Sequence, residues 1–493
     1  MRANVLVGRK WAIWLAGACL GAVALLHAGM RGNAQAAGKS PGGVSSAELT
    51  TEQVASIDSY VTTEMGRERI PGAEVGIYRR GQILLAKGYG LADVELNVPV
   101  KPETLFQSGS VGKQFVSAAV MMLVEEGKVG LDDSTTKFFP NAPGSWKPIL
   151  IKNLLSHTSG LAEYESRERA GPKGPFYLRL DFTEDELLEK AEAMPIEFQP
   201  GEKWAYRNTN YLLLGIMIHR VTGKFYADYL TERIFAPLGM KSTRLISDAD
   251  IIANRSSGYE FHGDKLQNQS WVSPTFNSTA DGALYFNVLD LAKWDEALYG
   301  TALLKQSSLD RIWTVYPLND GKPNRGHYGF GWTIETMNGH KVMGHGGAWQ
   351  GFTCEILRYV DDSMTVVVLT NLDAGHARPD QIAHVVAGLV NPALTPPPPK
   401  EHKEVAVDAK VFDGYTGRYQ LNADLILTIS REDDHLFAQV PGQEKVQLFP
   451  EGVRDYFLKA IEAEITFLTD STGRATELIL HQGGEDQHAK RID

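Results

Sequence analysis

Apolar positions along the first part of the chain recur with two different periods, which predict helices and β-hairpins in alternation. Residues 50–66 place apolar side chains at helical spacing and predict an amphipathic helix. Residues 73–79 and 82–89 are rich in strand formers on either side of a polar turn, which predicts a hairpin. Residues 113–127 again follow the helical period. This order favours an α+β fold in which helices flank an antiparallel sheet.

The middle of the chain is mainly helical in pattern. Thr183 to Glu186 forms a capping box that opens a helix ending near Met194, and residues 224–239 predict a further helix. Residues 162–182 hold charges and prolines and predict an excursion over the surface that could cover a site. Residues 240–280 show no clear period. The pattern therefore adds an all-helical region to the sheet.

Strands return towards the C-terminus. Residues 353–360 and 364–370 predict a strong hairpin, which completes a first domain over residues 50–390. Residues 391–410 begin with a proline-rich stretch and predict a stiff linker. Residues 411–493 alternate between short strand-like segments and turns, which predicts a small β-barrel or sheet domain.

The N-terminus has the pattern of a signal peptide over residues 1–36. Basic residues precede an apolar run, and Ala34-Gln35-Ala36 provides a cleavage site. The alternative is an uncleaved membrane anchor, since the run is nearly long enough to span a bilayer. Residues 37–49 are small and polar and predict a flexible linker. We expect an exported protein, periplasmic or extracellular, that meets a membrane only through an uncleaved leader.

Composition and charge narrow the classes of function. The net charge of −11 does not favour nucleic acid as a partner. Two cysteines are present, and removal of the leader with Cys19 leaves Cys354 as a free, buried thiol. No zinc-binding or other metal-binding motif occurs, so we expect no metal and no cofactor. The expected partner is a small-molecule or peptide substrate, and no feature indicates an oligomeric state.

The candidate chemistry begins at Ser110 and Lys113, at the start of the helix predicted over residues 113–127. Residues three apart lie on one helix face, so the lysine amine can take the serine proton once burial lowers its pKa. A second Ser-x-x-Lys copy, Ser134 to Lys137, lies in a polar stretch and predicts a solvated loop. Spacing alone therefore does not identify the nucleophile.

A tyrosine and an asparagine two residues apart, Tyr206 and Asn208, precede the next helix and would face the same way in an extended segment. A tyrosine hydroxyl near a lysine can relay a proton, and an asparagine amide can bind a substrate amide. Tyr285 and Asn287 repeat this spacing, and there Asn287 predicts a simple helix cap. His157, in a Ser-His-Thr-Ser-Gly stretch, predicts a turn-capping residue rather than a base.

A third stretch, His345-Gly346-Gly347-Ala348, opens a strand. Its glycines allow close approach of the backbone, and free amides at a strand edge can hold an oxyanion. An ordinary glycine-rich strand start is the alternative interpretation of this stretch by itself.

Together, Ser110-x-x-Lys113, Tyr206-x-Asn208 and His345-Gly346-Gly347, with LLSHTSGL at residues 154–161, resemble the serine β-lactamase and penicillin-binding-protein superfamily. The nearest group is class C β-lactamase-like, with peptidases of the S12 type, DD-carboxypeptidases and family VIII esterases. The segment around FDGYTGRY (412–419) resembles the lipocalin-like, DUF3471-type barrel appended to some of these hydrolases.

The resemblance implies roles for each stretch. Ser110 would be the acylated nucleophile, Lys113 its base, and Tyr206 the partner base and proton donor to the leaving group. Asn208 would hold the substrate amide. The amides of Ser110 and Ala348, next to Gly346 and Gly347, would form the oxyanion hole.

His345 would stand where lactamases usually carry a lysine, and a largely neutral histidine disfavours efficient β-lactamase action. The expected activity is that of an exported serine hydrolase, most simply a peptidase on D-amino-acid or peptide substrates. A family VIII-type esterase or a weak β-lactamase is the alternative. A non-catalytic ligand-binding module is the alternative of another class, and the three intact stretches argue against it. A phosphate-binding loop is excluded because Gly109 to Lys113 lacks the required spacing.

Overall fold

The computed structural model describes residues 48–396, 401–421, 426–440, 445–459, 463–482 and 485–493. The predicted signal peptide, which includes Cys19, lies outside these residues. Most of the 37–49 linker and part of the proline-rich linker also lie outside them. The described chain divides into two compact units, residues 48–396 and residues 401–493. Each unit is considered by itself.

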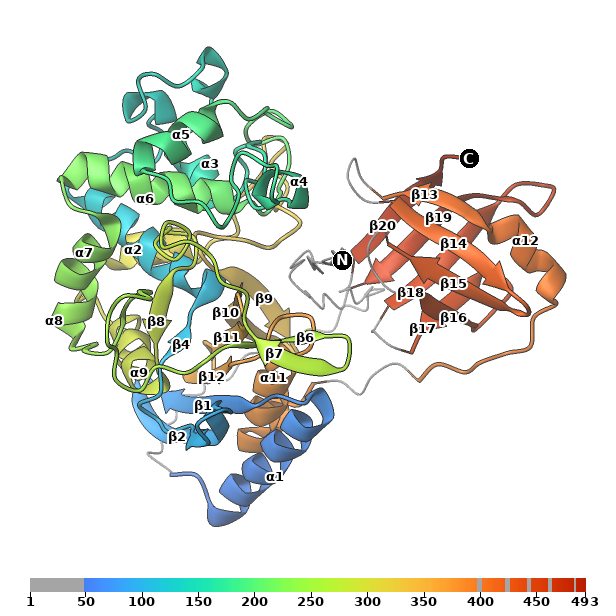
Figure 1. Ribbon diagram of the computed structural model, residues 1–493, viewed down its shortest axis with the longest axis horizontal. Coiled ribbons are helices and arrows are strands. Elements are labelled where there is room, and N and C mark those ends of the chain that lie inside the picture. Colours follow the sequence, from blue (N-terminus) through green and yellow to red (C-terminus); the bar gives the residue numbers. More distant parts are fainter. Residues whose placement is uncertain (1–47, 397–400, 422–425, 441–444, 460–462, 483–484) are drawn as a thin grey trace, which may run out of the picture. The chain divides into compact units, whose positions relative to one another are not determined.

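The first unit is built on a seven-stranded antiparallel sheet with the order β3-β2-β1-β12-β11-β10-β9 (Figure 1). Strand β1 from the start of the unit pairs with β12 from its end, from Ala73 opposite Thr370 to Arg79 opposite Met364. The strands are β1 (Gly72–Arg79), β2 (Gln82–Asp93), β3 (Val98–Pro99), β9 (Thr333–Met337), β10 (His340–Trp349), β11 (Phe352–Tyr359) and β12 (Met364–Thr370). Strand β1 also pairs with β2, and β11 pairs with β12, so both predicted hairpins are confirmed.

Two terminal helices, α1 (Thr51–Glu68) and α11 (Pro379–Val390), pack together beside this sheet. The first begins with a capping box between Thr50 and Gln53, and it buries Ile57, Val61 and Met65 as the apolar spacing predicts. Helix α11 contacts β11 and β12. The two ends of the unit thereby close one hydrophobic cluster.

A helical region follows β4 (Phe106–Gln107). Helix α2 (Lys113–Glu125) is buried from Lys113 to Leu123 and contacts α6, α7 and α10. A helix that is apolar on all sides belongs in a core, and α2 forms the centre of the largest cluster. The other helices are α3 (Ile151–Leu155), α4 (Arg167–Ala170), α5 (Glu184–Glu192), α6 (Asn208–Thr222), α7 (Tyr226–Leu230), α8 (Ala236–Leu238), α9 (Val288–Ala297) and α10 (Gln306–Ile312).

Two parts of this region differ from the sequence pattern. The single helix predicted over residues 224–239 is interrupted by a π-helical turn, Thr231–Phe235, between α7 and α8. The stretch 240–280, which shows no period, contains three strands that pair locally or with β8. The three strands are β5 (Arg244–Leu245), β6 (Tyr259–His262) and β7 (Lys265–Asn268), and their distant partner β8 is Leu284–Phe286.

The second unit is a closed eight-stranded antiparallel barrel preceded by the short helix α12 (Phe412–Tyr415). Its interior is filled by side chains such as Tyr419, Ile465 and Phe467. The strands are β13 (Gly417–Gln420), β14 (Ile426–Glu432), β15 (His435–Gln439), β16 (Val446–Pro450), β17 (Asp455–Leu458), β18 (Ala463–Thr469), β19 (Ala475–Gln482) and β20 (Glu485–Arg491). The predicted fold class, an antiparallel sheet with helices followed by a small barrel, is confirmed. Within the described ranges, no helix combines the length and apolar character needed to cross a membrane.

Candidate active site

Ser110 lies in a 3₁₀ turn, Gly109–Gly112, that joins β4 directly to α2. The turn is pressed against strand β10. Gly109 has φ +45°, and a Cβ there would lie 2.3 Å from the Ala348 nitrogen. A Cβ on Gly347 would lie 2.1 Å from the Ser108 oxygen. The glycines of both segments are therefore needed for the nucleophile turn to reach the strand.

Lys113 is fully buried beneath Ser110, and its Nζ has three acceptors. It lies 2.9 Å from Ser110 Oγ, 2.8 Å from Asn208 Oδ1 and 2.5 Å from the Asp281 carbonyl oxygen. Burial lowers the pKa of Lys113 to about 8, against the raising effect of Asp281 and two nearby glutamates. A minor fraction of the amine is therefore neutral at pH 7, and the neutral form predominates above about pH 8.

The acceptors fix the direction of the lysine lone pair. The Asn208 and Asp281 oxygens are carbonyl oxygens, which can only accept hydrogen bonds. A neutral Lys113 amine therefore spends its two hydrogens on them and turns its lone pair towards the Ser110 hydroxyl. This is the geometry of a general base acting on a serine nucleophile.

Tyr206 lies in the extended segment before α6, with its ring centroid 5.0 Å from Lys113 Nζ. Its buried hydroxyl has no well-formed hydrogen bond in the described structure. The Ser110 side chain lies close enough to it to lower its pKa somewhat. Burial is the larger effect and raises the pKa of Tyr206 well above its usual value. The hydroxyl therefore carries its proton at neutral pH and is free to give it to a bound molecule.

Asn208 is the first residue of α6 rather than part of an extended segment, yet its side chain still meets Lys113. Its Nδ2 donates to Glu165 Oε2 at 2.7 Å and its backbone N–H donates to Glu163 Oε2 at 2.7 Å. Both the oxygen and the nitrogen of the side-chain amide are thus hydrogen-bonded. A role for Asn208 in holding a substrate amide would require one of these bonds to be exchanged.

A cluster of carboxyl groups faces Ser110, and the sequence pattern did not identify it. Tyr164 has one hydroxyl proton but lies 2.9 Å from Glu165 Oε1 and 2.7 Å from Asp281 Oδ2. Burial raises the pKa of Glu165 to about 8 and that of Glu163 to about 7. A protonated Glu165 therefore donates to Tyr164, which donates to Asp281.

The segment 162–182, predicted to run over the surface, thus turns two of its charges inward. Glu163 and Glu165 directly follow the LLSHTSGL stretch, and this proximity is the one signal that could have drawn attention to them. No group of His, Cys, Asp and Glu within the described ranges is arranged to hold a metal ion.

His345 is buried on β10 and both of its ring nitrogens have partners. Nδ1 lies 2.6 Å from the Gly346 carbonyl oxygen and must donate to it, so Nε2 accepts from the Tyr328 hydroxyl at 2.8 Å. Burial and the nearby Lys113 lower the pKa of His345 to about 3. The position is therefore electrically neutral, and Tyr328 is a further member of the site that the sequence did not indicate.

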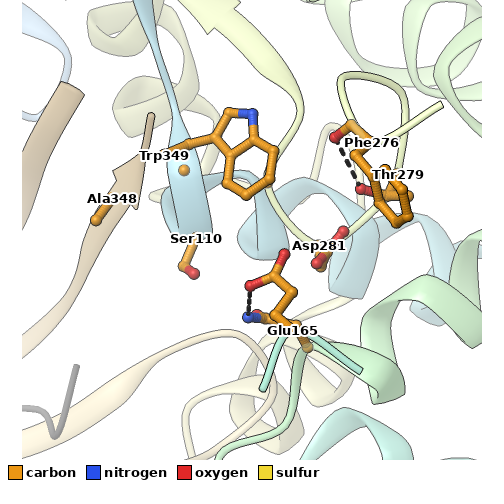
Figure 2. Close-up of a pocket in the computed structure, with 10 residues that line it drawn as sticks. Ser110, Glu165, Phe276, Thr279, Asp281, Ala348 and Trp349 are labelled. Carbon is orange, nitrogen blue, oxygen red and sulfur yellow. Dashed lines mark hydrogen bonds between the residues drawn. The ribbon is translucent and has the colours of Figure 1, made fainter. Parts of the chain in front are cut away.

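A pocket of about 250 Å³, open to solvent, is lined by Ser110, Asn208, Glu165, Asp281 and Ala348. Figure 2 shows Ser110 with the Trp349 indole on one side and the Glu165 and Asp281 carboxyl groups on the other. Gly346 and Gly347 lie beside it on β10, where Gly347 is buried against the nucleophile turn. The three stretches predicted from the sequence therefore meet at one place.

Comparison with known proteins agrees with this geometry. Residues 57–390 match the family described as Beta-lactamase. The chain belongs to the Beta-lactamase family. Residues 401–491 match a domain of unknown function, DUF3471. Both resemblances inferred from the sequence are confirmed.

Relatives of this Beta-lactamase family member include penicillin-binding protein 4* of Bacillus subtilis (strain 168), 28% identical over 435 residues that cover 83% of this chain and 93% of the relative. The octameric penicillin-binding protein homologue from Pyrococcus abyssi is 25% identical with a TM-score of 0.63, covering 89% of this chain and 100% of that one. D-amino acid amidase from Ochrobactrum anthropi SV3 is 24% identical with a TM-score of 0.57, covering 65% and 91%. The chain is a serine hydrolase of this superfamily.

Proposed function

We propose that the protein hydrolyses amide bonds through a Ser110 acyl-enzyme, on amino-acid or peptide-type substrates that carry a free cationic amine. The observation that carries the proposal is the Lys113 amine, buried and held by two carbonyl acceptors so that its lone pair meets Ser110 Oγ. A pure binding module has no need of this arrangement.

The reaction follows from these positions. Lys113 takes the Ser110 proton as Oγ forms a bond to the substrate carbonyl carbon, and the amides of Ser110 and Ala348 stabilise the oxyanion. The carbon–nitrogen bond then breaks as Tyr206 gives its proton to the leaving amine, and the proton on Lys113 replaces it. Water attacks the ester carbonyl carbon as Lys113 takes its proton, the carbon–Oγ bond breaks, and that proton passes from Lys113 to Ser110 Oγ.

The charge of the pocket supports an amine-bearing substrate. Asp281 is almost fully buried, and its Oδ1 accepts no hydrogen bond within the described ranges. Glu165 lies next to it and can ionise when a cation arrives. An ammonium group of the substrate would satisfy both carboxyl groups. The fold likeness to a D-amino acid amidase supports D-amino-acid amides as the first candidates.

The same charges argue against a β-lactam as the preferred substrate. A β-lactam carries a carboxylate, and the neutral His345 supplies no fixed positive charge to bind it. Amidase or peptidase action on a cationic substrate is therefore favoured over β-lactamase action. The pattern of residues 1–36 supports export to the periplasm or the exterior, where such peptide substrates would be met.

The test is hydrolysis of D-phenylalanine amide compared with its L-enantiomer, its N-acetyl derivative and a penicillin, with adduct formation followed by intact mass. We expect turnover of the D-amide, and at least about 10-fold higher kcat/KM than for the uncharged N-acetyl derivative, from a charged hydrogen bond of about 1.5–3 kcal/mol. Ser110→Ala should abolish both turnover and adduct. A wild-type protein that neither turns over nor forms an acyl adduct with any of these would refute the acyl-enzyme.

Glu165→Gln separates amine recognition from catalysis. The glutamine amide can donate to Tyr164 and accept from Asn208, as the protonated glutamate does, but it cannot ionise. We expect a raised KM for the free-amine substrate only. Equal effects on free and N-acetylated substrates would refute amine recognition.

A further inference from the structure

His157 holds the segment that carries Tyr206 from both sides. Its carbonyl oxygen accepts from the Ala205 N–H at 3.0 Å, and its ring Nδ1 accepts from the Arg207 N–H at 3.3 Å. The two neighbours of Tyr206 in the chain are therefore both bonded to one histidine. The residue is 1% exposed and has φ +57°, a left-handed conformation that most side chains avoid.

The His157 ring also packs on the rings of the site. Its centroid lies 4.2 Å from that of Tyr206, with 36° between the planes, and 4.8 Å from that of Tyr328, which bonds His345. The imidazole is thus a platform under Tyr206, the residue whose hydroxyl faces the nucleophile.

Neighbouring hydrogen bonds determine which ring nitrogen of His157 carries the proton. Ser159 Oγ accepts from the Leu161 N–H at 3.1 Å, so its own proton goes to Asn210 Oδ1 at 2.6 Å. The Asn210 amide is therefore oriented with Nδ2 towards His157 Nδ1, at 3.1 Å. Asn210 Nδ2 and the Arg207 N–H are both donors, so Nδ1 must be unprotonated and the proton lies on Nε2.

A cationic imidazole is incompatible with these contacts. Protonation would remove the Nδ1 lone pair that both donors use, and it would add a charge near Lys113. Nε2 is buried and has no hydrogen-bond acceptor in the described part of the chain. The ring is thus held neutral by its contacts, and it is not placed to exchange protons with the substrate.

We propose that His157 is a positioning residue for Tyr206, a neutral imidazole protonated at Nε2 that fixes the tyrosine for proton delivery to the leaving group. The inference rests on the proposed acyl-enzyme function. It explains the residue type, because the position requires a flat ring, a hydrogen-bond acceptor and tolerance of a left-handed backbone, and histidine provides all three.

Dependence on the leaving group tests this role. An amine must be protonated as it leaves, whereas p-nitrophenolate departs without help. We would compare a D-phenylalanine amide with the p-nitrophenyl ester of the same amino acid, using His157→Asn, which suits the left-handed backbone, and Tyr206→Phe. The matched control is His219→Asn, on the half-exposed histidine of α6 that pairs with Glu184.

We expect His157→Asn to lower kcat for the amide by about 10- to 100-fold, part of the effect of a general acid, while the ester loses less than about 3-fold. KM should change little for either substrate. Tyr206→Phe should show the same pattern, and the double variant should be no worse than Tyr206→Phe alone. Equal losses on both substrates, or additive losses in the double variant, would overturn the proposal.

A second measurement does not depend on activity. In the wild-type protein labelled with ¹⁵N-histidine, the His157 signals, assigned by through-space contacts to the Tyr206 ring, should show a neutral ring with the proton on Nε2 at pH 6. A cationic ring or a proton on Nδ1 would overturn the proposal even if the variant failed to fold. If the wild type hydrolysed neither substrate, the proposed function would fail while this result still decided the state of His157.

Discussion

Ser110–Lys113 and Ser134–Lys137 have the same spacing and opposite surroundings. Lys113 is fully buried and bonded to three acceptors, one of them Ser110. The Lys137 side chain is 54% exposed and pairs with Asp133 at 2.7 Å. Ser134 caps the short 3₁₀ turn that follows it. Spacing puts the serine and the lysine of each pair on one face, but burial and the choice of acceptors give Lys113, and not Lys137, the geometry of a base.

The two Tyr-x-Asn pairs differ in the same way. Asn287 accepts from the Asp290 N–H and caps α9, as its sequence context predicts. The Asn208 side chain instead accepts from Lys113 and donates to Glu165. The Glu163 carboxylate accepts the backbone N–H at the start of α6. An asparagine freed from capping by a neighbouring carboxylate is therefore available to the site.

The largest expected difference is between alanine variants of the two serines. Ser110→Ala should reduce amide hydrolysis by about 10⁴-fold or more, because the nucleophile is lost. Ser134→Ala should leave kcat/KM within about 2-fold and cost less than about 1 kcal/mol of stability. Steady-state kinetics with intact-mass detection of the adduct would measure both. Activity retained in Ser110→Ala would show that another residue is acylated.

The second-largest expected difference is between the glutamine variants of the two lysines. Lys113→Gln is expected to lower kcat/KM by about 10²- to 10⁴-fold, the usual contribution of a general base, whereas Lys137→Gln should be neutral. The active form has Lys113 deprotonated, so wild-type kcat/KM should rise with pH and level off above about 8. A pH–rate profile would measure this limb. Its persistence in Lys113→Gln would assign it to another group.

Close packing between the nucleophile turn and β10 predicts a smaller effect. Gly347→Ala should cost about 1–3 kcal/mol of stability and also lower activity, since the new Cβ would overlap the Ser108 oxygen. Gly66→Ala is the control, because nothing lies within 4 Å on that exposed helical position. It should stabilise by about 0.5–1 kcal/mol. Thermal unfolding and kcat/KM of both variants would decide whether the contact matters.

The smallest effect concerns the two asparagines. Asn287→Ala should destabilise by about 1 kcal/mol through loss of the cap, with kcat/KM unchanged. Asn208→Ala should do the reverse, lowering kcat/KM while the free energy of unfolding falls little. Chemical denaturation with parallel kinetics would measure both. Similar profiles for the two variants would remove the distinction between the cap and the site residue.

Local signals predicted the parts of the fold that depend on neighbouring residues. The hairpins around Arg80-Gly81 and residues 361–363, the capping box at Thr183 and the apolar face of α1 all have the expected form. Strand β5 was missed because its two residues pair only with the distant β8. The π-helical turn after α7 was missed because its residues continue a helical pattern.

The sequence by itself determined the fold class and the three stretches that supply Ser110, Lys113, Tyr206, Asn208 and His345, since their chemistry depends on residue type and short spacing. The tertiary structure alone decided which copy of each spacing lies in the site. It also brought Glu165, Asp281 and Tyr328 close to Ser110, lowered the pKa of Lys113 so that a neutral amine is available, and kept His345 neutral. These properties depend on burial and on partners far away in the chain, and a side chain acquires both only when the elements pack together.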